Sequence, residues 1–283
     1  MHFVPRFYLK RFLNHDMQVE VLDFKNERIA TPKGVGGICY GDFFYSQQTG
    51  EVDELGQIIE EWFKKMEDQI APSLDPIISK LLNNEQILPH EKWMLSLLMS
   101  MIWIRGPVMR ERINRMSDQI VKQINTVQFG SQFANSILDK IDIEVGGVTS
   151  AEIRKAVKEM LVKQDYTLEF DNTQHMLMFE EASNYANLFN AQHWLVYISR
   201  LPEKFITTDN PVVVTVPKTD TAYDPTFLDR KHYFPLTPDI CIEATYPHKS
   251  SKKTVQRKTL FPGNEREVLS LNLLLAGHSH QYA

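Results

Sequence analysis

The sequence has few cysteines, no long apolar run and no apolar leader, and each of these absences excludes a class of protein. Its two cysteines among 283 residues, Cys39 and Cys241, are too few and too far apart for a disulfide framework or a cysteine-rich zinc site. The most apolar run, Trp93 to Ile104, is too short to span a bilayer. Charged residues begin at once, so we expect no signal peptide. We therefore expect a reducing, cytoplasmic environment and no membrane association.

Motifs of catalysis and of metal binding are also missing. No Gly-x-Ser-x-Gly, His-Glu-x-x-His, Asp-x-Asp or Cys-x-x-Cys pattern occurs. The glycine-rich residues 34–37 lack the Gly-Lys-Ser/Thr ending of a phosphate loop. His278 and His280 would not share a face of a helix, so they could bind a metal only from an extended segment. We therefore expect no metal and no cofactor, and the role of these two histidines stays open.

The charge balance is mildly acidic, at −5. Such a surface disfavours non-specific nucleic-acid binding, although a local basic patch could still contact a nucleic acid or a nucleotide. One such stretch contains Lys249, Lys252, Lys253, Arg257 and Lys258. It has no interleaved aromatic residues on which bases could stack, and a solvated loop is the plain alternative.

Helical spacing dominates the middle of the sequence. A helix begins near Asp53, and Pro72 is expected to end it before Asp75 caps a short second one. The helix that begins at Pro89 is apolar almost all round, which predicts a central position in a bundle. Further helices are expected over residues 108–127, 149–163 and 173–190, with a last one after Asn264.

Strand patterns lie on either side of this helical region. Residues 18–24 alternate, and residues 28–31 are expected to return as a second strand. Compact β runs recur at 194–198, 205–208, 212–216 and 240–246, and residues 247–258 are expected to be a loop. The order favours an α+β fold, in which a central mainly α-helical region packs on a C-terminal antiparallel sheet that the N-terminal segment joins.

No linker composition and no repeat divides the chain, so we expect one domain over residues 1–283. Within it we expect an N-terminal docking segment and hairpin at 1–52, the helical region at 53–192, and the sheet with the last helix at 193–283.

The N-terminal stretch is rich in both aromatic and basic residues. Pro5 suits the first position of a helix, and Tyr8, Leu9 and Phe12 then line one apolar face. A terminus with this much apolar area should be docked. His2 precedes the positive end of this helix, which favours neutral imidazole near pH 7. Such an imidazole could act as a base or a ligand, or could only anchor the terminus.

Three other polar residues are candidates for a site. Asp209 and Asn210 follow an expected strand and are held by a proline, which suits a binding site and equally suits a turn. Arg105 ends the most apolar helix and needs an anionic partner, either an internal carboxylate such as Asp209 or an anion on a ligand. We expect His2, Arg105, Asp209 and Asn210 to meet in one polar cluster.

The opening run, His2-Phe3-Val4-Pro5-Arg6-Phe7-Tyr8-Leu9-Lys10-Arg11-Phe12, resembles the start of domain-of-unknown-function family 4238, a bacterial family. Further similar motifs span almost the whole chain: Ile104-Arg105-Gly106-Pro107, residues 205–211, residues 234–238 and Asn272. Residues 276–280 depart from the aromatic-rich close expected of the family. The resemblance implies an overall fold but no established activity. We count Arg6 and Asn272 with Arg105 as candidate substrate-binding residues.

Two functions are compatible with these residues. The first is a metal-independent enzyme acting on RNA or a nucleotide, with His2 as acid/base, Arg105 as phosphate binder, and Asp209 and Asn210 as orienting or catalytic groups. The second is a non-enzymatic binding or regulatory module, in which the same residues form a structural polar network.

Overall fold

The computed structural model describes residues 2–23, 26–41, 45, 54–129, 155, 159, 163–164, 179–215, 230–246 and 255–280. The chain divides into two compact units, residues 1–110 with 175–283, and residues 111–174. The first unit holds every site described below. A helical middle region is followed by a sheet, so the α+β class is confirmed. The expectation of one domain stays a prediction.

Helix α2 runs from Glu54 to Leu82 with Pro72 and Pro76 inside it. The predicted stop at Pro72 and the separate helix at Asp75 are therefore wrong. An internal proline costs about 3 kcal/mol, but burial of a large aliphatic side chain returns roughly 1.5–3 kcal/mol. Four such side chains lie on one face around the prolines and are at most 1% exposed: Ile70, Leu74, Ile77 and Leu81.

Helix α3, Pro89–Arg105, is buried along most of its length, as its all-round apolar character predicts. Two of its polar residues bind α8, Ala182–Ala191, and the residue just after it. The Ser100 hydroxyl donates to the carbonyl of Ala182 at 2.7 Å, and the Lys92 ammonium donates to the carbonyls of Asn190 and Gln192. Helix α4, Pro107–Phe129, begins directly after Gly106. The helix predicted at 149–163 lies almost wholly outside the described residues.

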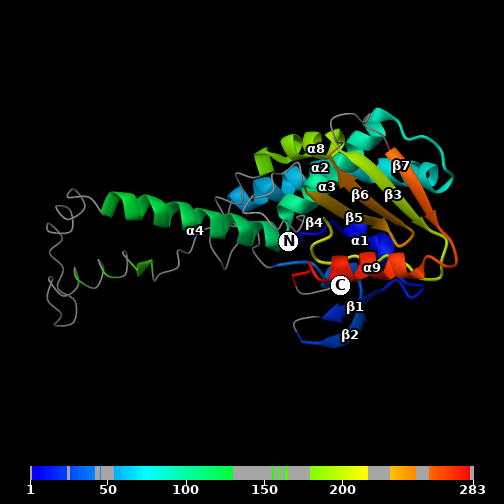
Figure 1. Ribbon diagram of the computed structural model, residues 1–283, viewed down its shortest axis with the longest axis horizontal. Helices are drawn as coiled ribbons and strands as arrows, with labels where there is room; N and C mark the ends of the chain where they lie inside the picture. Colours follow the sequence, from blue (N-terminus) through cyan, green and yellow to red (C-terminus); the bar gives the residue numbers. More distant parts are fainter. Residues whose placement is uncertain are drawn as a thin grey trace. The chain divides into compact units, whose positions relative to one another are not determined.

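The sheet has the strand order β4-β5-β6-β3-β7 (Figure 1). Strands β3 and β7 are parallel, while the other neighbours are antiparallel, so the sheet is mixed rather than purely antiparallel. The strands are β3 His193–Ser199, β4 Val213–Thr215, β5 Lys231–Thr237, β6 Ile240–Thr245 and β7 Val255–Leu260.

Two predictions about this region are wrong. Arg257 and Lys258 lie in β7 rather than in a loop, whereas Lys249, Lys252 and Lys253 lie outside the described residues. Residues 205–208 form no strand. Their backbone is bonded elsewhere, because the Phe205 amide donates to the carbonyl of Pro238 and the Ile206 amide donates to the side chain of Asn272.

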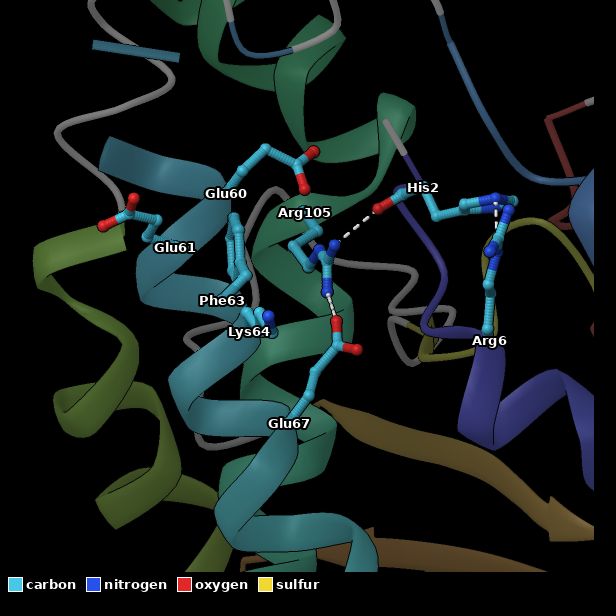
Figure 2. A pocket seen from close by; sticks show the side chains of 8 residues that line it. All are labelled: His2, Arg6, Glu60, Glu61, Phe63, Lys64, Glu67 and Arg105. Carbon is cyan, nitrogen blue, oxygen red and sulfur yellow. Dashed lines mark hydrogen bonds and ion pairs between the residues drawn. The ribbon is translucent and has the colours of Figure 1, made fainter. Parts of the chain in front are cut away.

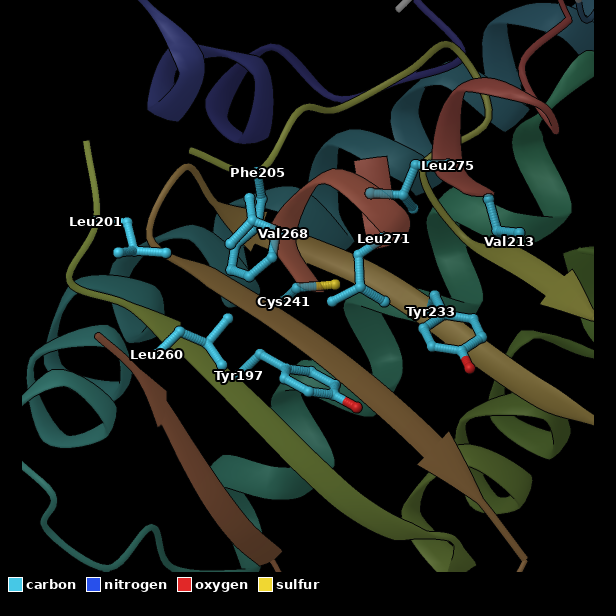
Figure 3. Packing of buried hydrophobic residues seen from close by; sticks show 10 residues of the cluster. All are labelled: Tyr197, Leu201, Phe205, Val213, Tyr233, Cys241, Leu260, Val268, Leu271 and Leu275. Carbon is cyan, nitrogen blue, oxygen red and sulfur yellow. The ribbon is translucent and has the colours of Figure 1, made fainter. Parts of the chain in front are cut away.

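Helix α9, Glu265–Ala276, covers one face of the sheet (Figure 1). Its inward side chains pack on the tyrosines and cysteine of that face (Figure 3). The opposite face meets α3 and α8, where the His232 ring lies edge-on to Trp103 and Phe189. The core cluster beneath α9 contains Tyr197, Leu201, Phe205, Val213, Tyr233, Cys241, Leu260, Val268, Leu271 and Leu275.

The N-terminal segment joins the sheet through side chains rather than as an added strand. Helix α1, Arg6–Leu9, continues as the 3-10 turn η1, Lys10–Phe12. The Tyr8 hydroxyl donates to the carbonyl of Pro235 at 2.6 Å, and the Tyr8 ring stacks on Phe234 at 5.4 Å. Because Tyr8 and Leu9 are at most 1% exposed, the N-terminal segment is docked rather than frayed.

After α1 the chain forms a separate antiparallel hairpin of β1, Val19–Asp23, and β2, Arg28–Lys33, as predicted. The 3-10 turn η2, Val35–Gly37, follows. Tyr40 is half exposed beside the ring of His2, and Tyr45 packs against Phe63 and Phe179. Phe43 and Phe44 lie outside the described residues.

Candidate functional site

Arg105 is the centre of the N-terminal polar network. It ends α3, and its side chain is almost fully buried. Its Nε donates to the Tyr45 hydroxyl at 2.9 Å, Nη1 to the Glu67 carboxylate at 2.5 Å and Nη2 to the backbone carbonyl of His2 at 2.5 Å. The guanidinium carbon also lies 4.0 Å from the ring centroid of Phe63 (Figure 2). Every nitrogen of the guanidinium therefore has a partner within the protein.

The electrostatics of this network fix its protonation state. Burial lowers the pKa of Arg105, but Tyr45 and Glu67 more than offset this, so the pKa lies above its usual value. Burial raises the pKa of Tyr45 to about 12, against the opposing effect of Arg105. The phenol thus keeps its proton, accepts from Arg105 and donates to the carbonyl of His2.

His2 contacts Arg105 only through its backbone, while its imidazole turns toward Arg6 (Figure 2). The Arg6 Nε donates to His2 Nε2 at 2.9 Å, which requires the imidazole to be neutral at that nitrogen. Burial, followed by the charge of Arg6, lowers the pKa of His2. The neutral form that we predict from the helix end therefore agrees with the direction of the shift, although burial rather than the helix end is its largest cause.

An open pocket of about 320 Å³ lies beside this network. His2 and Arg6 line one side, and helix α2 lines the other (Figure 2). The α2 residues of the lining are Glu60, Glu61, Phe63, Lys64 and Glu67. Three carboxylates and three cationic side chains line the pocket, so it offers no net positive charge to an anionic ligand.

Asp209 and Asn210 bind a different part of the chain. The Asp209 carboxylate accepts the backbone amide of His280 at 2.7 Å, and the Asn210 side chain donates to the backbone carbonyl of His278 at 2.9 Å. Both residues are buried. Asn210 also approaches the end of α3, because a side-chain carbon built on Gly106 would lie 3.9 Å from its Oδ1.

Direct contacts therefore join only part of the predicted cluster. His2, Arg6 and Arg105 are joined directly, and Asn210 lies against the residue after Arg105. Asp209 is not the carboxylate that pairs with Arg105, since Glu67 takes that place. Sequence reasoning missed Glu67 because its place among the charged residues of α2 resembles a solvated helix face.

Asn272 lies away from the pocket and holds the extended segment after β3. Its Oδ1 accepts the amide of Ile206 at 3.1 Å, and its Nδ2 donates to the carbonyl of Lys204 at 2.8 Å. The Asn272 side chain therefore makes the hydrogen bonds that a neighbouring strand would otherwise make with the backbone of Lys204 and Ile206. Of the two C-terminal histidines, His278 directs Nδ1 to the carbonyl of Leu274 at 2.9 Å, within its own helix end.

A second and larger hollow was not anticipated from the sequence. It has a volume of about 920 Å³ and lies between α1, the β1–β2 hairpin and residues 204–209. Cys39 lies in its wall with the backbone in the left-handed region, at φ 52°. Burial, followed by the charge of Asp209, raises the pKa of the Cys39 thiol, so it stays protonated. We call this hollow the hairpin groove.

Two kinds of structural feature are absent from the described ranges. No group of three or more His, Cys, Asp or Glu side chains is arranged to hold a metal ion there. In the same parts of the chain, none of the helices combines the length and the hydropathy that a bilayer crossing requires.

The fold and the polar network define an α+β protein with two hollows on the unit that contains both ends of the chain. The chain belongs to the DUF4238 family, described as a protein of unknown function, whose model matches residues 1–283. No curated protein sequence and no solved structure matches the chain.

Proposed function

We propose that this protein is a non-enzymatic binding or regulatory module in which the residues of the N-terminal network are structural. The saturation of Arg105 carries the proposal. Its guanidinium is almost fully buried, and each of its three nitrogens donates a hydrogen bond within the protein, to Tyr45, Glu67 and the carbonyl of His2. A phosphate that took over one of these bonds would displace Tyr45, Glu67 or the carbonyl of His2 and leave a buried polar group unpaired.

The roles of Asp209 and Asn210 support the same proposal. Their side chains are bonded to the backbone of His278 and His280, so they hold the chain after α9 in place. Buried and satisfied polar networks of this kind specify one arrangement of elements without doing chemistry. Here the elements are the first residues, α2, the end of α3 and the end of α9.

The test is a His2→Ala variant measured in two ways. If the network is structural, the variant keeps the His2 carbonyl that Arg105 binds and loses at most about 1 kcal/mol of stability with the exposed Arg6–His2 hydrogen bond, and wild type shows no hydrolysis of RNA or nucleotides. The matched control is His15→Ala, a histidine outside the network. Wild-type turnover that disappears in a stably folded His2→Ala protein would instead establish the enzyme.

A second candidate is a metal-independent enzyme acting on a phosphate-bearing substrate such as RNA or a nucleotide. One observation favours it: the neutral imidazole of His2 and the exposed guanidinium of Arg6 line the same open pocket. Under this proposal His2 is the acid/base and Arg6, instead of the saturated Arg105, binds the phosphate. The carboxylates of Glu60 and Glu61 in the same lining weigh against a phosphate there.

The wider setting is also a proposal. The family resemblance and the two lone cysteines support a bacterial cytoplasmic protein without a metal or cofactor. A nucleic-acid partner would meet the basic stretch at β7, where Lys258 is already paired with Glu267 at 2.5 Å. That pairing reduces the charge available to a phosphate and adds to the case for the non-enzymatic module.

A further inference from the structure

The hairpin groove has the size and the walls of a small-molecule site. Pockets for small ligands have volumes of roughly 300–1,000 Å³ and mostly apolar linings, and this groove holds about 920 Å³. Its apolar lining comes from three separated parts of the chain: Leu9 and Phe12, Val21 and Leu22, and Phe205 and Ile206.

The mouth of the groove carries apolar side chains that face solvent. Ile29 on β2 is 84% exposed and Leu22 on β1 is 39% exposed, and both line the groove. Exposure of large aliphatic groups around a hollow marks a surface that gains free energy when an apolar body covers it.

The polar groups of the wall are mostly engaged with the protein. Thr207 Oγ1 bonds the Tyr8 hydroxyl at 2.7 Å, and Thr208 Oγ1 accepts the amide of Asn210 at 3.1 Å. Lys204 is paired with Asp239 at 2.6 Å. These contacts leave apolar surface as the main feature that a ligand can use.

Charge then decides between classes of ligand. Among the described lining residues, Lys204 is the single lysine or arginine, whereas Glu20, Asp209 and Asp239 are carboxylates. The lining therefore repels an anionic group more than it attracts one. The raised pKa of Cys39 keeps its thiol neutral, which adds to the apolar character of the wall.

We propose that the hairpin groove binds a small, uncharged and predominantly apolar molecule, one per chain. This deepens the proposed binding function and rests on it, because it names the class of ligand that the module takes. Binding would cover Leu22 and Ile29 and bridge the β1–β2 hairpin to residues 204–209.

The experiment uses two dyes that share one aromatic skeleton. N-Phenyl-1-naphthylamine is uncharged, and 8-anilino-1-naphthalenesulfonate carries a sulfonate. Fluorescence titration of the full chain should show one uncharged dye per chain, bound at least about tenfold more tightly than the sulfonate. Equal or tighter binding of the sulfonate would overturn the proposal.

A matched pair of variants locates the dye. Leu22→Glu with Ile29→Glu places two charges on the groove wall and should weaken binding of the uncharged dye at least about tenfold. Leu269→Glu with Leu273→Glu alters two exposed leucines of α9 outside the groove and should leave the affinity within about twofold. Equal loss in both variants, or no loss in the first, would show that the dye binds elsewhere.

Amide NMR shifts of the wild-type protein locate the dye in a second way, which does not require any variant to fold. The uncharged dye should shift amides of β1 and residues 204–209 and leave α9 unchanged, and the reverse pattern would overturn the proposal. Failure of dye binding would leave the structural role of the His2 network intact. Turnover that depends on His2 would overturn the proposed non-enzymatic function while the dye result stood.

Discussion

At the scale of single residues, Arg105 shows how a buried cation is accommodated. Its charge is balanced by Glu67, its remaining donors meet Tyr45 and the carbonyl of His2, and Phe63 lies close to the guanidinium carbon. Loss of one partner in such a set leaves the others buried and unpaired, which costs more than the interaction itself contributes.

We predict that Arg105→Ala lowers the free energy of unfolding by about 3–5 kcal/mol, because Glu67, Tyr45 and the carbonyl of His2 would be left without their donor. Urea unfolding measures this. The matched control is Arg11→Ala, since the exposed Arg11–Asp75 ion pair at 2.7 Å should contribute at most about 1 kcal/mol. Equal losses in the two variants would contradict the central place of Arg105.

The second prediction at this scale concerns pH. The folded pKa of His2 lies below its usual 6.5, so the unfolded chain binds this proton more tightly. Its contribution to stability is present above pH 6.5 and is lost as the pH falls through the lowered folded pKa. We predict that wild type loses more stability than His2→Gln between about pH 7.5 and about pH 5. Urea titrations at several pH values would refute this if the two proteins gave parallel curves.

At the scale of elements, the docking of α1 depends on a few fully buried groups. Val4, Tyr8 and Leu9 are at most 1% exposed, and the Tyr8 hydroxyl replaces a strand partner for the carbonyl of Pro235. We predict that deletion of residues 1–12 costs several kcal/mol, at roughly 2 kcal/mol for each large side chain removed from the core. A melting temperature unchanged by the deletion would show that the segment contributes little.

Helix α2 permits a test of its internal prolines. Pro72 is exposed, so replacing it removes no core contact. We predict that Pro72→Ala raises the free energy of unfolding by about 1–3 kcal/mol, because alanine restores a helical hydrogen bond and relieves the crowding of the preceding turn. Pro89→Ala is the control, since Pro89 stands at the start of α3, where proline is tolerated. A loss of stability in Pro72→Ala would indicate that the helix needs a bend there.

At the scale of the whole molecule, local sequence patterns predicted most helices and strands but few of the tertiary contacts between them. The alternation over residues 18–24 predicted that Val19 and Val21 share one face of β1, which the structure shows to be the buried face, and the all-round apolar run predicted the central α3. Residues 205–208 had strand composition, yet Asn272 and Pro238 took their backbone bonds from far along the chain. The pattern of a short stretch of sequence gives no information about hydrogen-bond partners that lie so far away along the chain.

The same limit applies to the candidate site. The sequence predicted an anionic partner for Arg105, either an internal carboxylate such as Asp209 or an anion on a ligand. It could not identify Glu67, because that pairing depends on how α2 packs against α3. The hairpin groove was not predicted, since its walls come from residues 9–39 and 204–239 and become one surface only in the folded unit.

The bond between Tyr8 and Pro235 also sets an order of events during synthesis. Its two residues are 227 positions apart, a length that a ribosome makes in about 10–45 s at about 5–20 residues per second. The aromatic N-terminal segment therefore cannot dock in its native position until β5 and β6 have been synthesised. Pulse-labelled hydrogen exchange during refolding should show the amides of Tyr8 and Leu9 protected no earlier than those of β5. Earlier protection would mean that α1 first packs on a nearer part of the chain, and until it docks its aromatic face is available to chaperones and proteases.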